Sequence, residues 1–145
     1  MGTASNEEKK QFLWGYRDSL RRIERIKAEM EELRAMKANL SAGGSGAGRK
    51  GWKNDLSGRM ARLDSLEEDK EKELCRMIQV YEQVEKAINS LKDEQERNVL
   101  FYRYIKGLDW QGIAGKMVYS ERWVYMVHGK ALAHLKIPKE IMELQ

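Results

Sequence analysis

Apolar residues recur in steps of three and four near the N-terminus, which is the stripe of an amphipathic helix. Ser5 or Asn6 can cap this helix, and Glu7 and Glu8 occupy its favourable first turn. The stripe consists of Leu13, Tyr16, Leu20, Ile23, Ile26, Met30, Leu33, Met36 and Leu40. The pattern therefore predicts an N-terminal helix as the first part of the chain, residues 1–40.

A second stripe follows after a Gly-rich run. Residues 41–52 are predicted to be a flexible linker, because a segment with so many glycines behaves as a flexible coil. Residues 53–91 are predicted to form a second long helix, although its middle, Glu67 to Glu73, is almost entirely charged and is expected to be solvated. Its stripe consists of Leu56, Met60, Leu63, Leu66, Leu74, Met77, Ile78, Tyr81, Val84, Ile88 and Leu91.

Two striped helices joined by a flexible turn predict an antiparallel hairpin or coiled coil. Pairing between two subunits would bury the same stripes, so a homodimer through this helical arm is also expected. The pattern does not distinguish pairing within one chain from pairing between chains.

Residues 92–145 show a different pattern, that of three short helices. The first ends at Gly107, which is placed to take a left-handed backbone. Asp109 can then cap a helix over 110–117, and Ser120 can cap another that runs from Glu121 to about Leu135. Two short helices separated by about three residues predict a helix-turn-helix. We therefore expect an all-α protein with a compact C-terminal helix-turn-helix domain.

The last of these helices has distinct inner and outer faces. Its predicted inner stripe is Val124, Val127, Ala131, Leu132 and Leu135, against which Ile113 and Ala114 would pack. Its outer face near the N-terminal end carries Glu121, Arg122, Tyr125, Met126 and, further on, Lys130. A recognition helix reads base edges with this first turn, so Arg122 can contact guanine or phosphate, and Tyr125 or Met126 a thymine methyl group.

Composition and charge agree with a helical DNA-binding protein. The 145 residues include 34% charged residues and a single proline, which disfavours sheet folds. The net charge is +4, but residues 97–139 hold 8 basic and 2 acidic side chains, an excess that attracts polyanions.

No apolar run approaches the ~20 residues of a membrane span, and the N-terminus lacks a signal peptide's apolar stretch. We therefore expect a cytoplasmic protein that does not bind a membrane.

The C-terminal part of the chain resembles a known family. The segment from Asp109 to Leu135 is similar, without gaps, to region four of sigma factors, and Val99–Gly107 has the family's apolar helix with Arg-Tyr before a Gly-Leu-x-Trp sequence. The run Tyr-Ser-Glu-Arg-x-Val-Tyr-x-x-His-Gly-x-Ala-Leu resembles small phage and prophage proteins of Gram-positive bacteria more strongly, relatives of the ArpU- and RinA-type late transcription regulators. The resemblance covers about a third of the chain.

This resemblance implies binding of double-stranded DNA to regulate phage genes in a bacterial host cell. The base-contacting positions of the family fall on Glu121, Arg122, Tyr125 and Met126, and the phosphate-contacting positions on Arg103, Trp110, Gln111, Ser120 and Lys130. The chain departs from the family at Val118, where glycine is usual, because a β-branched residue is strained at a positive φ. Tyr125 and Met126 replace longer polar groups, which predicts a different target sequence.

The remaining candidate chemistry has ordinary structural interpretations. His128 and His134 lie six residues apart on one helix and cannot chelate one metal from the same face, so we expect capping or surface histidines. Cys75, beside Leu74, is expected to be a buried or half-buried thiol, and Trp14 and Trp52 core or interface aromatics. We find no phosphate-binding loop, nucleophile elbow or zinc spacing, and predict no enzyme, no cofactor and no metal site.

Two other functions remain open. A sigma-like surface can dock on RNA polymerase, with the helical arm binding a further partner, and the apolar residues Tyr125 and Met126 fit this alternative. Small terminase subunits also combine a helix-turn-helix with an oligomerising arm, so a DNA-packaging factor is the other alternative.

Overall fold

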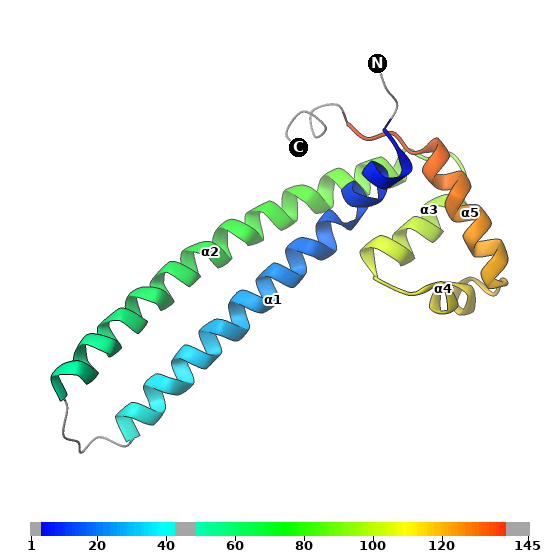
Figure 1. The fold of residues 1–145 in the computed structure, drawn as a ribbon. Helices are drawn as coiled ribbons and strands as arrows, with labels where there is room; N and C mark the ends of the chain where they lie inside the picture. The colour runs from blue at the N-terminus through cyan, green and yellow to red at the C-terminus, as the bar shows by residue number, and fades with distance from the viewer. Residues whose placement is uncertain (1–3, 43–48, 139–145) are drawn as a thin grey trace. The chain divides into compact units, whose positions relative to one another are not determined.

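The computed structural model describes residues 4–42 and 49–138, with side chains for 4–39 and 56–138. Every regular element of these residues is helical, which confirms the predicted all-α class (Figure 1). None of the described helices combines the length and apolar content that a membrane span requires. The elements are α1 (Asn6–Ala42), α2 (Arg49–Asn89), α3 (Glu94–Leu100), the π-helix η1 (Phe101–Ile105), α4 (Trp110–Met117) and α5 (Glu121–His134).

The long helices differ slightly from their predicted bounds. α1 continues to Ala42 and α2 begins at Arg49, so residues 41–42 and 49–52 of the predicted linker are helical. Residues 43–48 of that linker lie outside the described residues, as does the side chain of Trp52.

The chain divides into two compact units. One, which we call the hairpin unit, is Ser19–Arg76. The other, which we call the terminal unit, comprises the chain up to Asp18 together with the chain from Met77 onward. The terminal unit is thus larger than the domain predicted over 92–145, because it draws on the start of α1 and the end of α2.

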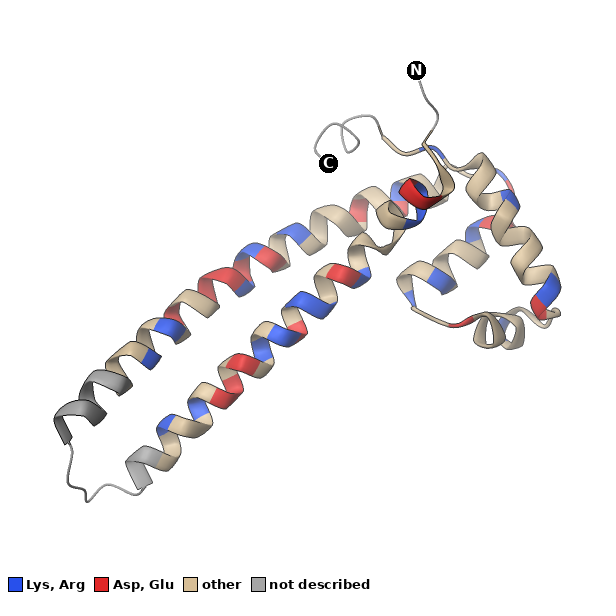
Figure 2. Ribbon diagram, in the orientation of Figure 1, with Lys and Arg blue, Asp and Glu red and all other residues tan. Residues whose placement is uncertain are grey.

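In the hairpin unit, α1 and α2 run antiparallel and pair within one chain (Figure 1). Ile23, Met30 and Leu66 from the two predicted stripes are buried between them. Acidic and basic residues follow both helices (Figure 2). Among the described residues, ion pairs cross from one helix to the other. They join Arg22 to Glu73 at 2.8 Å, Arg62 to Glu29 at 3.1 Å and Arg34 to Glu67 at 3.8 Å.

These ion pairs change the interpretation of the charged middle of α2. Exposed pairs contribute little stability each, roughly 0–1 kcal/mol. Their spacing along both helices instead favours one register of the hairpin. Glu67 and Glu73 therefore belong to the helix pairing, although the sequence marked this stretch only as solvated.

Cys75 corrects one expectation. Its side chain is exposed and not buried or half-buried. It lies directly after Leu74, which is partly buried on the stripe, and an adjacent helical position points about 100° away from that stripe.

The terminal unit has one principal core built from both ends of the chain. Phe12 and Leu13 of α1 are buried against residues from α2, the α3–η1 segment and α5, and Trp14 packs against the same cluster. The other buried members are Val84, Ala87, Ile88, Leu91, Leu100, Tyr104, Ile105, Ala131, Leu132 and Leu135. The first turns of α1 therefore belong to the unit that holds the predicted helix-turn-helix.

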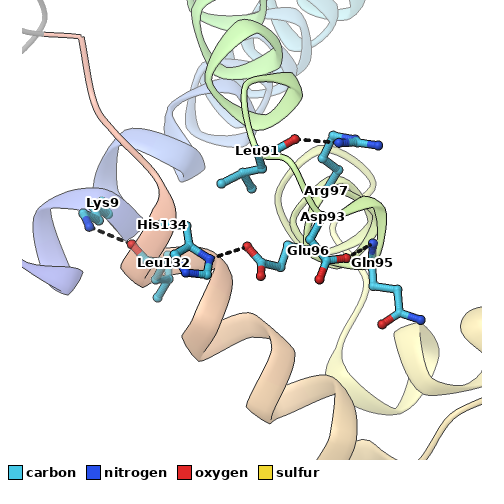
Figure 3. Close-up of polar contacts among 8 residues, drawn as sticks. All are labelled: Lys9, Leu91, Asp93, Gln95, Glu96, Arg97, Leu132 and His134. Atoms are coloured by element: carbon cyan, nitrogen blue, oxygen red, sulfur yellow. Dashed lines mark hydrogen bonds and ion pairs between the residues drawn. The ribbon is translucent and has the colours of Figure 1, made fainter.

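A buried lysine strengthens this connection. Lys9 is only 7% exposed, and its Nζ donates to the main-chain oxygen of Leu132 at 2.6 Å (Figure 3). The last carbonyl groups of a helix lack partners within it and carry partial negative charge, so a cation is favourable there. Lys9 thus satisfies a carbonyl in the last turn of α5 from a helix 123 residues away in the sequence.

This shared core yields a test. We expect Leu13→Ala to lower the free energy of unfolding by about 2–5 kcal/mol, since Leu13 is fully buried and its removal leaves a cavity. The control is Met36→Ala on the same helix, where the side chain is 42% exposed and the change should stay within about 0.5 kcal/mol. Urea unfolding followed by circular dichroism measures both. Equal small effects would exclude the start of α1 from the core.

Candidate nucleic-acid interface

α4 and α5 are joined by a three-residue turn and are capped as the sequence predicts. The Asp109 carboxylate accepts from the Gly112 main-chain N–H at 2.7 Å, and Ser120 Oγ accepts from that of Trp123 at 3.1 Å. Each cap satisfies one of the N–H groups that a helix leaves unpaired at its start. The two caps therefore fix where α4 and α5 begin.

The turn contains the strained residue that the sequence predicts. Val118 has φ 60° and ψ 48°, a left-handed conformation that crowds the Cβ of any non-glycine residue. Tyr119 helps to hold the turn, because its ring stacks on Trp123 at 3.7 Å and its hydroxyl accepts from Gln95 Nε2 at 3.3 Å. Gly107 also has the expected positive φ, 75°.

The inner face of α5 is buried as predicted. Val124 and Val127 form a second core cluster with Val99 of α3 and Ile113 of α4, against which Ala114 packs. Further along α5, Ala131, Leu132 and Leu135 enter the principal core. This burial leaves the opposite face of α5 free.

That free face carries all four predicted base-contacting residues. Glu121, Arg122, Tyr125 and Met126 are exposed, with Tyr125 at 61% and Met126 at 50%. Together with Trp110 of α4 they line a shallow open hollow. We call these five residues the α5 hollow.

Trp110, one of the predicted phosphate contacts, is half-buried and packs against the Tyr125 ring that borders this hollow. Its ring lies 4.9 Å from that of Tyr125 and 4.7 Å from that of His128. The Arg103 guanidinium lies 4.3 Å from the same indole on a cation–π contact. The indole therefore connects the exposed Tyr125 to the interior.

Arg103, another predicted phosphate contact, is held by protein groups. Its guanidinium also lies 5.2 Å from the ring of Trp14, and Nη1 donates to the Leu108 carbonyl at 3.1 Å. Its Nε is buried and has no hydrogen-bond partner within the described residues. These contacts give Arg103 a supporting role beneath Trp110.

The other predicted phosphate contacts lie at the surface. Gln111, Ser120 and Lys130 are exposed. Sequence reasoning did not single out Lys116 and Lys136, which are exposed as well. Like Lys130, they form no ion pair or hydrogen bond within the described part of the chain. The excess of basic over acidic residues in 97–139 was the signal that could have identified them.

His128 corrects the expectation of a capping or surface histidine. It is buried, and its Nε2 lies 2.7 Å from the Tyr104 hydroxyl, which comes from η1. Burial lowers the pKa of His128 to about 4, aided by the nearby positive charges of Lys10 and Arg103. Burial raises the pKa of Tyr104 to about 12. Tyr104 therefore keeps its proton and can donate it to a neutral imidazole.

His134 is a surface histidine, as expected, but it has a buried partner. Its Nδ1 lies 2.8 Å from Oε1 of Glu96, whose side chain is almost fully buried on α3 (Figure 3). Nearby, the Asp93 carboxylate caps α3 by accepting from the Gln95 N–H at 2.8 Å, and Arg97 bonds to the Leu91 carbonyl. The contact between Glu96 and His134 therefore joins α3 to the last turn of α5.

The described residues contain no group of three or more His, Cys, Asp or Glu side chains that could hold a metal ion. The α5 hollow presents an apolar aromatic surface beside a guanidinium and a carboxylate.

Comparison with known proteins gives one match. Residues 17–136 match a family described as a protein of unknown function, DUF722. No curated protein and no solved structure matches the chain.

The strained turn predicts a stabilising substitution. We expect Val118→Gly to raise the free energy of unfolding by about 0.5–1 kcal/mol, because relief of the left-handed strain exceeds the entropy that glycine loses on folding. Gly107→Ala is the matched control with the opposite sign, since its new Cβ would lie 2.7 Å from Arg17 Cζ at φ 75°. Thermal melting measures both, and a lower melting temperature for Val118→Gly would contradict the left-handed turn.

The buried imidazole predicts a pH dependence. The pKa of His128 is about 4 in the folded protein and 6.5 as the ordinary value, so the unfolded chain binds the extra proton between these values. The contribution of His128 to stability is therefore complete above pH 6.5 and decreases as the pH falls. We expect a loss of about 2 kcal/mol between roughly pH 7 and pH 5.

The measurement is urea unfolding of the wild type and of His128→Gln across this pH range. The variant lacks the titrating group, so its stability should fall less steeply with decreasing pH. Parallel pH profiles would show that His128 is not buried as a neutral group.

Proposed function

The chain belongs to the DUF722 family, and we propose that it is a sequence-specific, non-catalytic reader of double-stranded DNA that regulates phage or prophage transcription in the bacterial cytoplasm. The observation that carries this proposal is the division of α5 into two faces. One face is buried along its length, while Glu121, Arg122, Tyr125 and Met126 stand exposed on its first turns. A helix built in this way can enter a major groove with its N-terminal end.

The charges around α5 support the proposal. Lys116, Lys130 and Lys136 are exposed and have no acidic partner among the described residues, so their charges remain available to phosphates. Gln111 at the start of α4 and the hydroxyl of Ser120 just before α5 add hydrogen-bond donors. Phosphate contacts of this kind set the register of a protein on the duplex, while base contacts select the sequence.

The two helix caps also support the proposal, because they hold the reading side chains in place. Asp109 and Ser120 fix the starts of α4 and α5, so the side chains at the start of α5 are presented in one geometry. A rigid presentation reduces the entropy lost on binding and strengthens discrimination between sequences.

A second candidate function is docking on RNA polymerase. The observation that favours it is the apolar character of the exposed side chains in this region. Val118 is 86% exposed and Tyr119 44%, next to Tyr125 and Met126 on α5. Exposed apolar residues that lie together are typical of protein interfaces.

We also propose that the protein forms a homodimer through the helical arm. The stripes of α1 and α2 pair within one chain in the hairpin unit, and a dimer would use an apolar residue of the arm that stays exposed, such as Ile78 of α2. A dimer of DNA readers binds two half-sites related by symmetry.

Selection of bound duplexes from a random DNA library at two salt concentrations tests the function. We expect a motif, with an affinity that falls steeply with salt. Symmetric half-sites would support the dimer. Failure to recover any motif would contradict the proposal and favour docking on RNA polymerase. A pull-down with the polymerase would then test that alternative.

A pair of variants tests the assignment of roles. We expect Arg122→Ala to cost about 1–3 kcal/mol on the selected site and much less on random DNA, because a base contact is lost. Lys130→Ala should weaken both complexes about equally and lower the salt slope by about 1, as for a phosphate contact. Fluorescence anisotropy measures these affinities. Equal losses on both DNAs for Arg122→Ala would make it a phosphate contact.

A further inference from the structure

We propose that the α5 hollow recognises a thymine next to a guanine, reading the thymine by its 5-methyl group. This inference rests on the DNA-reading function proposed above and specifies the target of that same surface. It differs from a general role for the first turns of α5 because it assigns Arg122 to a guanine and Tyr125 with Met126 to the neighbouring thymine.

The residues that line the hollow define its chemistry. Tyr125, Met126 and Trp110 supply apolar surface, while Arg122 and Glu121 supply charge at its edge. Thymine is the only standard base with a methyl group in the major groove, and an apolar surface is the partner that such a group prefers. Guanine presents O6 and N7 together, which match the paired donors of an arginine.

The spacing on the helix makes the two bases neighbours. Arg122 and Tyr125 are three residues apart, and Arg122 and Met126 four, so all three lie on one face. Their Cβ atoms are then about 5–6 Å apart, whereas successive base pairs are about 3.4 Å apart. Side chains from this one face can therefore contact adjacent base pairs.

Packing beneath the hollow holds the Tyr125 ring in place, and a fixed ring can make a defined apolar contact with a base. The Tyr125 ring lies 4.9 Å from Trp110, and Trp110 lies against His128 and Arg103. Tyr125 is therefore backed by a packed aromatic group although 61% of it is exposed. A ring that is packed on one side can exclude water from a thymine methyl group. This exclusion of water is the source of the proposed preference of the hollow for thymine over uracil.

Charge complementarity identifies the occupant as a nucleic acid and not an apolar peptide. Arg122 forms no ion pair or hydrogen bond within the described residues, and Lys130 is exposed two turns further along the same helix. Unpaired cations beside an apolar hollow suit a polyanion that carries one apolar group at its edge.

The test uses the duplex obtained by selection, with single-atom changes to its bases. Replacing thymine by uracil next to a guanine removes only the methyl group, and we expect about a fourfold loss of affinity for one buried methyl. Replacing that guanine by 7-deazaguanine removes the N7 acceptor and should also weaken binding by the wild type. In Arg122→Ala, the 7-deaza substitution should have no further effect.

Two variants link the methyl preference to the hollow. We expect Tyr125→Ala and Met126→Ala to bring the ratio of the uracil to the thymine dissociation constant towards one. Met60→Ala, an exposed methionine of the hairpin unit, is the matched control and should keep the wild-type ratio. Because Tyr125 and Met126 are exposed, the variants are expected to fold, and far-UV circular dichroism checks this.

The outcomes separate this inference from the proposed function. If uracil binds as tightly as thymine at every position next to a guanine, while a motif and the salt dependence persist, the inference is wrong and DNA reading stands. If selection yields no motif, the proposed function fails and the inference fails with it.

Discussion

The terminal unit depends on the burial of the first turns of α1 beside the last turns of α5. Leu13 has no exposed surface, and Phe12 is nearly as buried, in a core shared with Leu132 and Leu135. Lys9 adds a charged hydrogen bond to the end of α5 in a place where an unpaired ammonium would be costly. Without these residues the C-terminal part of the inner stripe of α5 would lose part of its cover.

Above this core, the exposed and buried parts of α5 are connected through aromatic rings. Tyr125 at the surface contacts Trp110, Trp110 contacts His128, and His128 is bonded to Tyr104. The imidazole is neutral at physiological pH because burial disfavours its charged form, so this connection places no extra cation below the surface. The positive charge available to the proposed DNA partner therefore comes from exposed lysines and Arg122.

Local features of the terminal unit could be predicted from the sequence because each depends on a few neighbouring residues. Asp109 and Ser120 cap their helices, and Gly107 and Val118 take the left-handed conformations expected of their positions. The inner stripe of α5 follows from its periodicity. The proposed reading residues were likewise expected to be exposed.

Contacts between distant residues could not be predicted in this way. The pairs Tyr104–His128 and Glu96–His134 join helices whose approach no local pattern specifies. For the same reason the sequence predicted Arg103 and Trp110 as phosphate contacts but did not predict that each packs against residues of other helices.

The bond between Lys9 and Leu132 has a consequence for how the protein is made. Its two residues lie 123 positions apart, so at a synthesis rate of roughly 5–20 residues per second about 6–25 s separate their appearance on the ribosome. Ser19–Arg76 is continuous in sequence and can close during that interval. Phe12 and Leu13 are instead buried only once α5 has been made, so the start of α1 remains an apolar segment that a chaperone can bind until then.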